Sequence, residues 1–197
     1  MIDENLLLKN GALYEEYSAK ELIYHVGDRP RYYFQVMRGT VELNNYHEDG
    51  KEFTLNIISQ GQSFGESLLF SDKRYPTNAI AKTDCRVLKL ARPDFLKMLS
   101  ENNKLMFVIF QYLSDRLFYK YVMLFNNSAL DPIIKIKSLM DYYKESSLKK
   151  KKYSYEVPFT RQQIANLTGL RVETVIRTVK RMEQENMVKI DGRQILY

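Results

Sequence analysis

Short runs of apolar and polar residues alternate along the chain between positions 21 and 90. Turn-forming pairs such as Gly27-Asp28 and Asp49-Gly50 separate these runs at spacings of roughly 8 to 12 residues. Many short strands at that spacing are typical of an antiparallel double-sheet or closed structure. The pattern therefore predicts a β-roll, or jelly roll, with strands at 22–25, 32–37, 41–46, 52–58, 78–81 and 85–90.

The pattern changes to a helical period after Arg92-Pro93, first in a short helix to about residue 99 and then in a long helix over 103–127. Apolar residues on the long helix recur at alternating spacings of four and three, which is the spacing of a coiled-coil seam, and Lys120 occupies one seam position. We expect this helix to pair with a second copy and make the protein a homodimer. The alternative is a helix buried within a monomer. The predicted dimer seam consists of Met106, Phe110, Leu113, Leu117 and Leu124.

A break at residues 128–132 follows, and a further helix is predicted over 133–143 because Pro132 suits a first helical turn. Residues 149–152 are four lysines in succession, in a polar loop that precedes an extended segment over 153–159. We expect these lysines to be solvated, and contact with phosphates is the alternative.

Residues 160–183, TRQQIANLTGLRVETVIRTVKRME, carry the most specific pattern in the chain. Thr160 is a good N-cap for a short helix ending at Thr168, and Gly169 suits a turn that needs a left-handed backbone. A second helix is predicted from Val172 to Glu185. Two helices joined by such a turn form a helix-turn-helix, a motif that places its second helix in the DNA major groove.

The second helix separates into two faces when its residues are placed about 100° apart around the helix axis. One face groups Val175, Val179 and Met182, which we expect to be buried. The apolar residues expected to pack against them are Ile164, Leu167 and Leu170.

The opposite face has the chemistry to read base edges. Arg177 can donate two hydrogen bonds to guanine O6 and N7, and Glu173 can accept one from cytosine N4. Val172 and Ile176 can contact a thymine methyl group. The amino-terminus of the first helix and the neighbouring cations can hold backbone phosphates. The residues predicted to contact phosphates are Thr160, Arg161, Gln162, Arg171 and Lys180.

A plain surface ion pair between Glu173 and Arg177, four residues apart, is the alternative interpretation. Three neighbouring features favour DNA reading: the apolar back of the helix, the preceding glycine turn and a wing-like terminal hairpin over 188–196. The hairpin is expected to turn at Asp191-Gly192. These features predict a winged helix-turn-helix.

The charge distribution agrees with this assignment. The net charge of +6 lies in the last third, because residues 1–127 carry 16 basic and 16 acidic side chains whereas 128–197 carry 14 and 8. A basic segment is suited to a polyanion such as double-stranded DNA. The sequence thus predicts an α+β protein with a β-roll sensor domain over 1–102, a dimerisation helix over 103–127 and a DNA-binding domain over 128–197.

The sequence has few of the cysteine and histidine residues that metal and redox sites use as ligands. Cys85 is the single cysteine, and His25 and His47 are the two histidines, too few for an iron–sulfur cluster or a clustered imidazole metal centre. A lone cysteine and the absence of a signal-like opening favour a cytoplasmic protein. We expect no metal, haem or iron–sulfur site and no enzyme activity.

The longest apolar segment, 105–125, is interrupted by Asp115, Arg116 and Lys120. A membrane span needs about 20 nearly uncharged residues. No membrane-spanning helix and no membrane partner are predicted.

Five segments of the chain match a known family in order. They are Tyr24-His25-Val26-Gly27-Asp28, Met37-Arg38-Gly39-Thr40-Val41, Gly61 with Phe64-Gly65-Glu66, Ser114-Asp115-Arg116-Leu117, and Glu173-Thr174-Val175-Ile176-Arg177. Through them the chain resembles the Crp/Fnr family of bacterial regulators over nearly its full length. The resemblance implies that the β-roll binds an effector, that the long helix dimerises and that RNA polymerase is a partner.

The residue before Glu173 refines this resemblance. Val172 is similar to the Fnr-type reading helix, whereas the cyclic-AMP receptor type has arginine there. The similarity implies half-sites close to TTGA, with Glu173 and Arg177 on the G·C pair. An inverted palindrome of such half-sites, about one helical turn apart, is the expected target.

The resemblance also implies an effector site in the β-roll. The family's cyclic-nucleotide signature is Gly-Glu followed about ten residues later by an arginine that pairs with the phosphate. Gly65 and Glu66 match it, but the equivalent stretch, 75–78, lacks the arginine, although Arg74 is close. Losing that bidentate partner argues against cyclic AMP, and the amino-terminal cysteines of oxygen-sensing Fnr proteins are absent. We therefore expect no cofactor. The candidate effector residues are Gly65, Glu66, Ser67, Thr77, Lys120 and Tyr121.

Two other functions stay open at this point: a cyclic-nucleotide-binding adaptor with a degenerate head, and a cupin-like enzyme with an accessory nucleic-acid domain. The outward pair Glu173 and Arg177 argues against the adaptor. The lack of metal ligands and of a nucleophile–base group argues against the enzyme.

Overall fold

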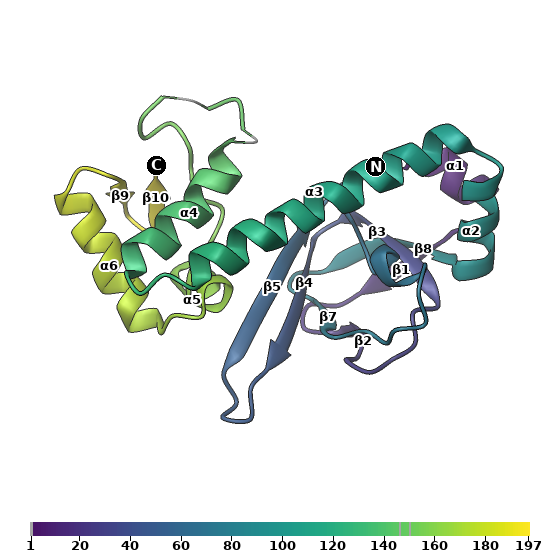
Figure 1. Ribbon diagram of the computed structural model, residues 1–197, viewed down its shortest axis with the longest axis horizontal. Coiled ribbons are helices and arrows are strands. Elements are labelled where there is room, and N and C mark those ends of the chain that lie inside the picture. The colour runs from purple at the N-terminus through teal and green to yellow at the C-terminus, as the bar shows by residue number, and fades with distance from the viewer. Residues whose placement is uncertain (1, 146, 150) are drawn as a thin grey trace. The chain divides into compact units, whose positions relative to one another are not determined.

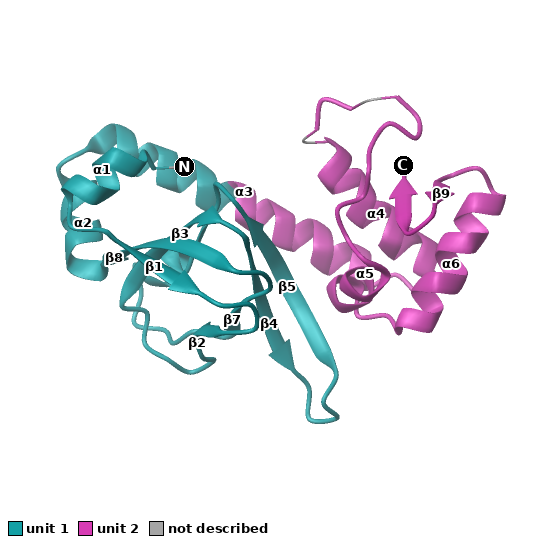
Figure 2. Cartoon of the chain, turned by 180° about the vertical axis from the view of Figure 1, so that it is seen from behind, with its two compact units in different colours: residues 1–114 teal, residues 115–197 magenta. Residues whose placement is uncertain are grey.

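The computed structural model describes residues 2–145, 147–149 and 151–197. The chain forms two compact units, Met1–Ser114 and Asp115–Tyr197, shown in different colours in Figure 2. The boundary lies inside the long helix α3 (Asn103–Asn127), so each unit includes part of that helix. The remaining helices are α1 (Glu4–Lys9), α2 (Arg92–Ser100), α4 (Pro132–Glu145), α5 (Arg161–Thr168) and α6 (Val172–Gln184), and Glu66–Leu68 forms one 3₁₀ turn.

Unit 1 is built on two four-stranded antiparallel sheets (Figure 1). The first sheet has the order β1-β8-β3-β6 and the second β2-β7-β4-β5. Apart from β4 and β5, which are neighbours in the second sheet, strands that follow each other in sequence lie in different sheets, so the chain passes repeatedly between the two sheets. The strands are β1 (Leu13–Tyr17), β2 (Leu22–Tyr24), β3 (Tyr32–Arg38), β4 (Thr40–Tyr46), β5 (Glu52–Ser59), β6 (Ser63–Phe64), β7 (Asn78–Ala81) and β8 (Cys85–Ala91).

Two apolar cores hold unit 1 together. The first core lies between the two sheets, where Val36 and Val87 meet Val41, Ile58 and their neighbours. The second core joins the first sheet to the helices; its members include Tyr33 and Phe95, whose rings stack 4.7 Å apart. Alternate residues of one strand therefore serve different cores, which is the period-two pattern of a buried strand. The predicted β-roll is confirmed.

The six predicted strands are all present, with ends within about one residue of the prediction. The prediction missed β1, β6 and α1. Strand β1, LYEEY, pairs with β8 only, so it is an edge strand, and its adjacent Glu15 and Glu16 obscure the apolar alternation. Strand β6 is two residues long, too short for any period to be seen.

The residues of the predicted dimer seam differ in their exposure along the long helix. Leu113 packs against the helix-side core of unit 1, and Met106 is half-buried. Phe110, Leu117 and Leu124 are exposed as a seam requires. Leu105 and Ile109 are buried, and Leu113 follows at the next position four residues on, so this face of the helix packs against the core of unit 1. The seam remains a prediction. The large apolar residues exposed on α3 are Phe107, Val108, Phe110, Leu117, Phe118, Tyr121, Leu124 and Phe125. Five of them recur at spacings of three, four and seven residues and form the exposed apolar line of α3: Phe107, Phe110, Leu117, Tyr121 and Leu124.

Unit 2 packs the end of α3 against α4 through aromatic rings. Tyr119 lies 4.7 Å from Tyr142 and 6.2 Å from Tyr143, measured between ring centroids. Tyr143 continues the contact to Phe159 at 4.8 Å. Burial raises the pKa of both Tyr119 and Tyr143, the latter to about 12, so both rings stay neutral across the physiological range.

A terminal hairpin of β9 (Lys189–Asp191) and β10 (Gln194–Leu196) completes unit 2. Asp191 pairs with Gln194, so the turn residues are Gly192 and Arg193, one position later than predicted. Gly192 has φ +56°, which the tight turn requires. The predicted extended segment 153–159 makes a single bridge, Glu156 to Leu196, with backbone hydrogen bonds between Tyr155 and Tyr197 on one side of it.

Candidate nucleic-acid interface

The first helix of the motif, α5, begins and ends as the sequence predicts. The Thr160 hydroxyl oxygen accepts a hydrogen bond from the Gln163 backbone N–H at 3.2 Å, and Gln163 Oε1 accepts one from the Thr160 N–H at 2.9 Å. This reciprocal capping box satisfies donors that a helix start leaves free. Gly169 ends α5 with φ +69°, in the left-handed region where glycine is favoured. The helix-turn-helix is confirmed.

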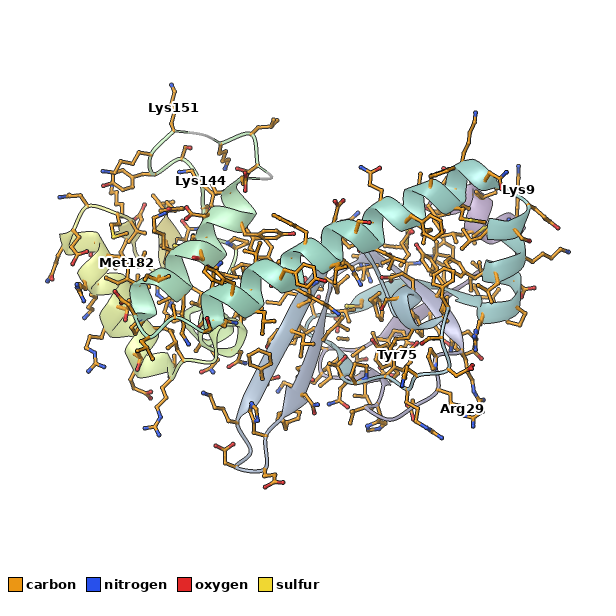
Figure 3. The ribbon with its side chains drawn as sticks, in the orientation of Figure 1. Lys9, Arg29, Tyr75, Lys144, Lys151 and Met182 are labelled. Carbon is orange, nitrogen blue, oxygen red and sulfur yellow. The ribbon has the colours of Figure 1, made fainter. Side chains whose placement is uncertain are left out.

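The inner face of α6 is apolar and fully buried. Val175, Val179 and Met182, the last labelled in Figure 3, are almost inaccessible to solvent. Ile164 and Leu167 of α5 are buried with them, whereas Leu170 is half-buried. Burying a Val or Met side chain contributes about 1.5 to 3 kcal/mol, so these contacts fix the rotation of α6. That rotation determines which residues reach the outer face.

The outer face of α6 presents Glu173, Ile176, Arg177 and Lys180 to solvent, with Val172 half-buried at its start. These exposed residues line a shallow depression of about 600 Å³. Neither Glu173 nor Arg177 is ion-paired with any residue that the structure describes. The surface ion pair considered from the sequence is therefore absent, and both side chains keep their hydrogen-bonding groups for a ligand.

The predicted phosphate contacts divide into two kinds. Arg171 and Lys180 are exposed. Arg161 is half-buried, its Nη1 donates to the Arg193 carbonyl oxygen, and burial lowers the pKa of its guanidinium. Gln162 Nε2 donates to Asn166 Oδ1 at 2.8 Å. Arg161 lies at the amino-terminus of α5, and its hydrogen bond to Arg193 also links this helix to the terminal hairpin.

The structure adds residues that the sequence reasoning missed. Arg181 and Gln184 line the same depression as Arg177, four and seven residues further along the helix. That helical spacing could have identified them. Lys189 and Arg193 are exposed on the hairpin, which the Glu183 carboxylate anchors by accepting the Ile190 N–H at 2.8 Å.

The interior of the β-roll is filled by aromatic rings. Tyr24 stacks on Tyr75 at 3.7 Å, and Phe34 stacks on Phe64 at 4.9 Å. All four side chains are buried. Gly65 has φ +81°, and a Cβ there would lie 3.1 Å from Tyr75 Oη, so the backbone passes tightly beneath this ring. Burial raises the pKa of Tyr75.

The candidate effector residues differ in how far they are exposed to solvent. Glu66 and Thr77 are buried, whereas Ser67 is exposed. Lys120 and Tyr121 belong to unit 2, where both are exposed. A group of aromatic side chains occupies the space between the sheets where the resemblance implies an effector.

Among the described residues no helix is long and apolar enough to cross a membrane. Within the same ranges no three His, Cys, Asp or Glu side chains gather where they could hold a metal ion.

Comparison with known families assigns both halves of the chain. A cyclic nucleotide-binding domain model matches residues 14–102, and a Crp-like helix-turn-helix domain model matches residues 137–197. Similar curated proteins include the cAMP-activated global transcriptional regulator CRP of Haemophilus influenzae, 26% identical over 92% of this chain and 82% of the relative. The cAMP-activated global transcriptional regulator Vfr of Pseudomonas aeruginosa is 24% identical over 91% of this chain and 86% of its own.

Solved structures agree on the fold. The c-di-GMP responsive global regulator CLP of Xanthomonas campestris superposes with a TM-score of 0.77 at 19% identity, over 98% of each chain. FixK2 of Bradyrhizobium japonicum gives 0.76 at 19% identity, over 94% of this chain and 91% of its own. Because the two domain models follow one another in the same chain, as the β-roll and the helix-turn-helix do in the structure, this protein belongs to the Crp/Fnr family of DNA-binding transcription regulators.

Proposed function

We propose that this regulator binds an inverted palindrome as a homodimer, with one α6 in the major groove at each half-site. The observation that carries the proposal is the pair Glu173 and Arg177, exposed without ion-pair partners among the described residues, on a helix whose opposite face is buried. Their hydrogen-bonding groups match a C·G pair, and Val172 and Ile176 suit thymine methyl groups. TTGA-like half-sites follow from the resemblance of this segment to the Fnr type.

The homodimer is supported by the exposed apolar line of α3. Large apolar side chains facing water along one side of a helix mark an interaction surface, and their four-and-three spacing suits a parallel helical partner. Two copies related by a twofold axis would present two α6 helices to DNA, which matches an inverted repeat. RNA polymerase is the protein partner that we propose for such a regulator, on the basis of its family.

Replacing Arg177 with alanine should lower affinity for the selected palindrome by about 1 to 3 kcal/mol per half-site, with relaxed preference at the guanine position. The reason is the loss of two hydrogen bonds to one base. Selection of binding sites from random duplexes, followed by fluorescence anisotropy on the selected and a scrambled duplex, measures both effects.

Arg177→Lys is the matched control for charge, because lysine keeps the cation but cannot form the bidentate contact. We expect this variant to keep most affinity for scrambled DNA and to lose specificity like Arg177→Ala. Equal losses on selected and scrambled duplexes in both variants would show that Arg177 contacts phosphates only.

Cyclic AMP does not fit this β-roll. Tyr75 lies in the stretch where the cyclic-nucleotide signature places an arginine, and its ring fills the space beside Gly65. If cyclic AMP did bind, a concentration of 100 times its dissociation constant would raise the free energy of unfolding by about 2.7 kcal/mol. We expect millimolar cyclic AMP to leave the thermal unfolding midpoint and the affinity for the palindrome unchanged. A clear upward shift of the midpoint would contradict the fit argument.

A further inference from the structure

A basic groove lies on the surface of the β-roll, outside the aromatic interior. Its main depression has a volume of about 520 Å³ and is lined by cationic and aromatic side chains, including Arg29, Arg31, Arg74 and Lys89. A second depression of about 430 Å³ adjoins it, shares Arg29 and Arg31, and adds Arg92. A volume of several hundred cubic ångströms is that of a site for a small organic ligand.

Most cationic side chains of the groove are not neutralised by ion pairs within the described part of the protein. Arg29, Arg31 and Arg74 are exposed and have no ion-pair partner among the residues that the structure describes. Lys89 pairs with Glu15 at 2.9 Å, and Asp28 is the one acidic residue lining the main depression. The Asp28 carboxylate accepts the His25 backbone N–H at 2.9 Å. The groove therefore has an excess of positive charge.

The backbone that carries these arginines is held in place from several directions. The Gly27 N–H donates to the Tyr75 carbonyl at 2.8 Å, and the Tyr75 N–H donates to the Asp28 carbonyl at 2.9 Å. Arg74 Nη1 donates to the Gly27 carbonyl at 2.7 Å, and the Arg92 N–H donates to the Arg31 carbonyl at 2.8 Å. Because the loop is already ordered, binding a ligand costs little backbone entropy.

The stacked rings beneath the loop form the floor of the groove. Tyr75, whose ring fills the roll, lines the main depression together with Tyr24 and Phe34, and Figure 3 labels Tyr75 inside unit 1 and Arg29 near its edge. Tyr32 is partly exposed at the point shared by the two depressions, with Lys89 Nζ 4.2 Å from its ring centroid. The rings exclude water from below and leave the cationic side open.

We propose that this groove binds a phosphate chain, supplied either by a nucleoside polyphosphate or by inorganic polyphosphate. Guanidinium groups match phosphate oxygens with paired hydrogen bonds, and Arg29 and Arg31 sit where the two depressions meet, so one ligand can span both. The groove opens over the rings that fill the roll, and its lining residues differ from those of the DNA-reading face. The inference goes beyond the proposed DNA function and does not depend on it.

The test is isothermal titration calorimetry of the full chain, without DNA and at low salt, with inorganic tripolyphosphate and with ATP as probes. Wild type is expected to bind at least one probe, with affinity that falls as salt rises. Arg31→Ala and Arg74→Ala should each weaken binding roughly tenfold, since each removes one charged hydrogen-bond donor group. Arg29→Ala is the third groove variant and lies on the same loop as Arg31. Thermal unfolding of each variant verifies that it folds.

Arg38→Ala and Arg177→Ala are the controls. Arg38 is an exposed arginine of the same unit outside the groove, where it pairs with Glu16, and Arg177 tests the DNA-reading face. Both variants should bind the probes like wild type. Tighter binding of ATP than of tripolyphosphate would assign the ligand as a nucleotide, and equal or weaker binding would assign it as a phosphate chain alone. No heat with either probe, or unchanged binding in all three groove variants, would overturn the proposal and leave the DNA function untouched.

Discussion

Substitution of Gly39 by alanine should destabilise the β-roll by about 2 to 5 kcal/mol, combining backbone strain with overpacking. Gly39 is the single residue between β3 in one sheet and β4 in the other, and its φ is +89°. A Cβ there would lie 2.4 Å from the Asp84 carbonyl oxygen and 2.7 Å from Cys85 Sγ. The carbonyl belongs to the backbone, so it cannot rotate away. Urea unfolding followed by circular dichroism measures the loss.

Gly50 provides the matched control for backbone strain. Its φ is +79°, but a Cβ there would meet nothing within 4 Å. Gly50→Ala should therefore cost only the left-handed penalty of about 1 to 2 kcal/mol. Similar losses in the two variants would mean that the contact at Gly39 relaxes and that backbone conformation alone explains its glycine.

The strands and helices were predictable because each carries its own periodicity. Strand β3, YYFQVMR, alternates between the two cores, and the reading helix α6 has Val175, Val179 and Met182 on one side. Glycine turns marked where these elements end. Strand β1 was not predicted, because it lies at a sheet edge. There Glu16 can face solvent without cost, so the strand lacks a clear alternation of apolar and polar residues.

Features made by residues distant in sequence were not predictable. Tyr24 and Tyr75 are 51 positions apart, and only the fold shows that their rings stack and fill the roll. The inward-facing side of α3 was not predictable for the same reason, because Leu113 packs against a core whose strands the helical period does not include. The absence of an ion pair between Glu173 and Arg177 also required side-chain positions. The identities of the reading residues, in contrast, followed from spacing alone and remain predictions until DNA binding is measured.

The dimer proposal predicts the largest change in assembly, for Leu124→Asp. Leu124 is 74% exposed near the end of α3, so the substitution should leave the fold of unit 2 intact. A dimer would bury two copies of this leucine, at about 1.5 to 3 kcal/mol each, so its loss should cost about 3 to 6 kcal/mol. That is roughly a hundredfold to ten-thousandfold increase in the dimer dissociation constant. Sedimentation velocity over a micromolar concentration series measures it.

Leu130 provides the matched control, since it is 99% exposed just beyond the end of α3. Leu130→Asp adds the same charge and removes the same side chain, and we expect it to leave the dimer unchanged. DNA binding should separate the variants further: Leu124→Asp should lose affinity for the palindrome but keep the affinity of wild type for a single half-site, because α6 is unaltered. A Leu124→Asp protein that sediments as a dimer would show that the exposed line of α3 is not the subunit contact, and the palindrome would then need another source of symmetry.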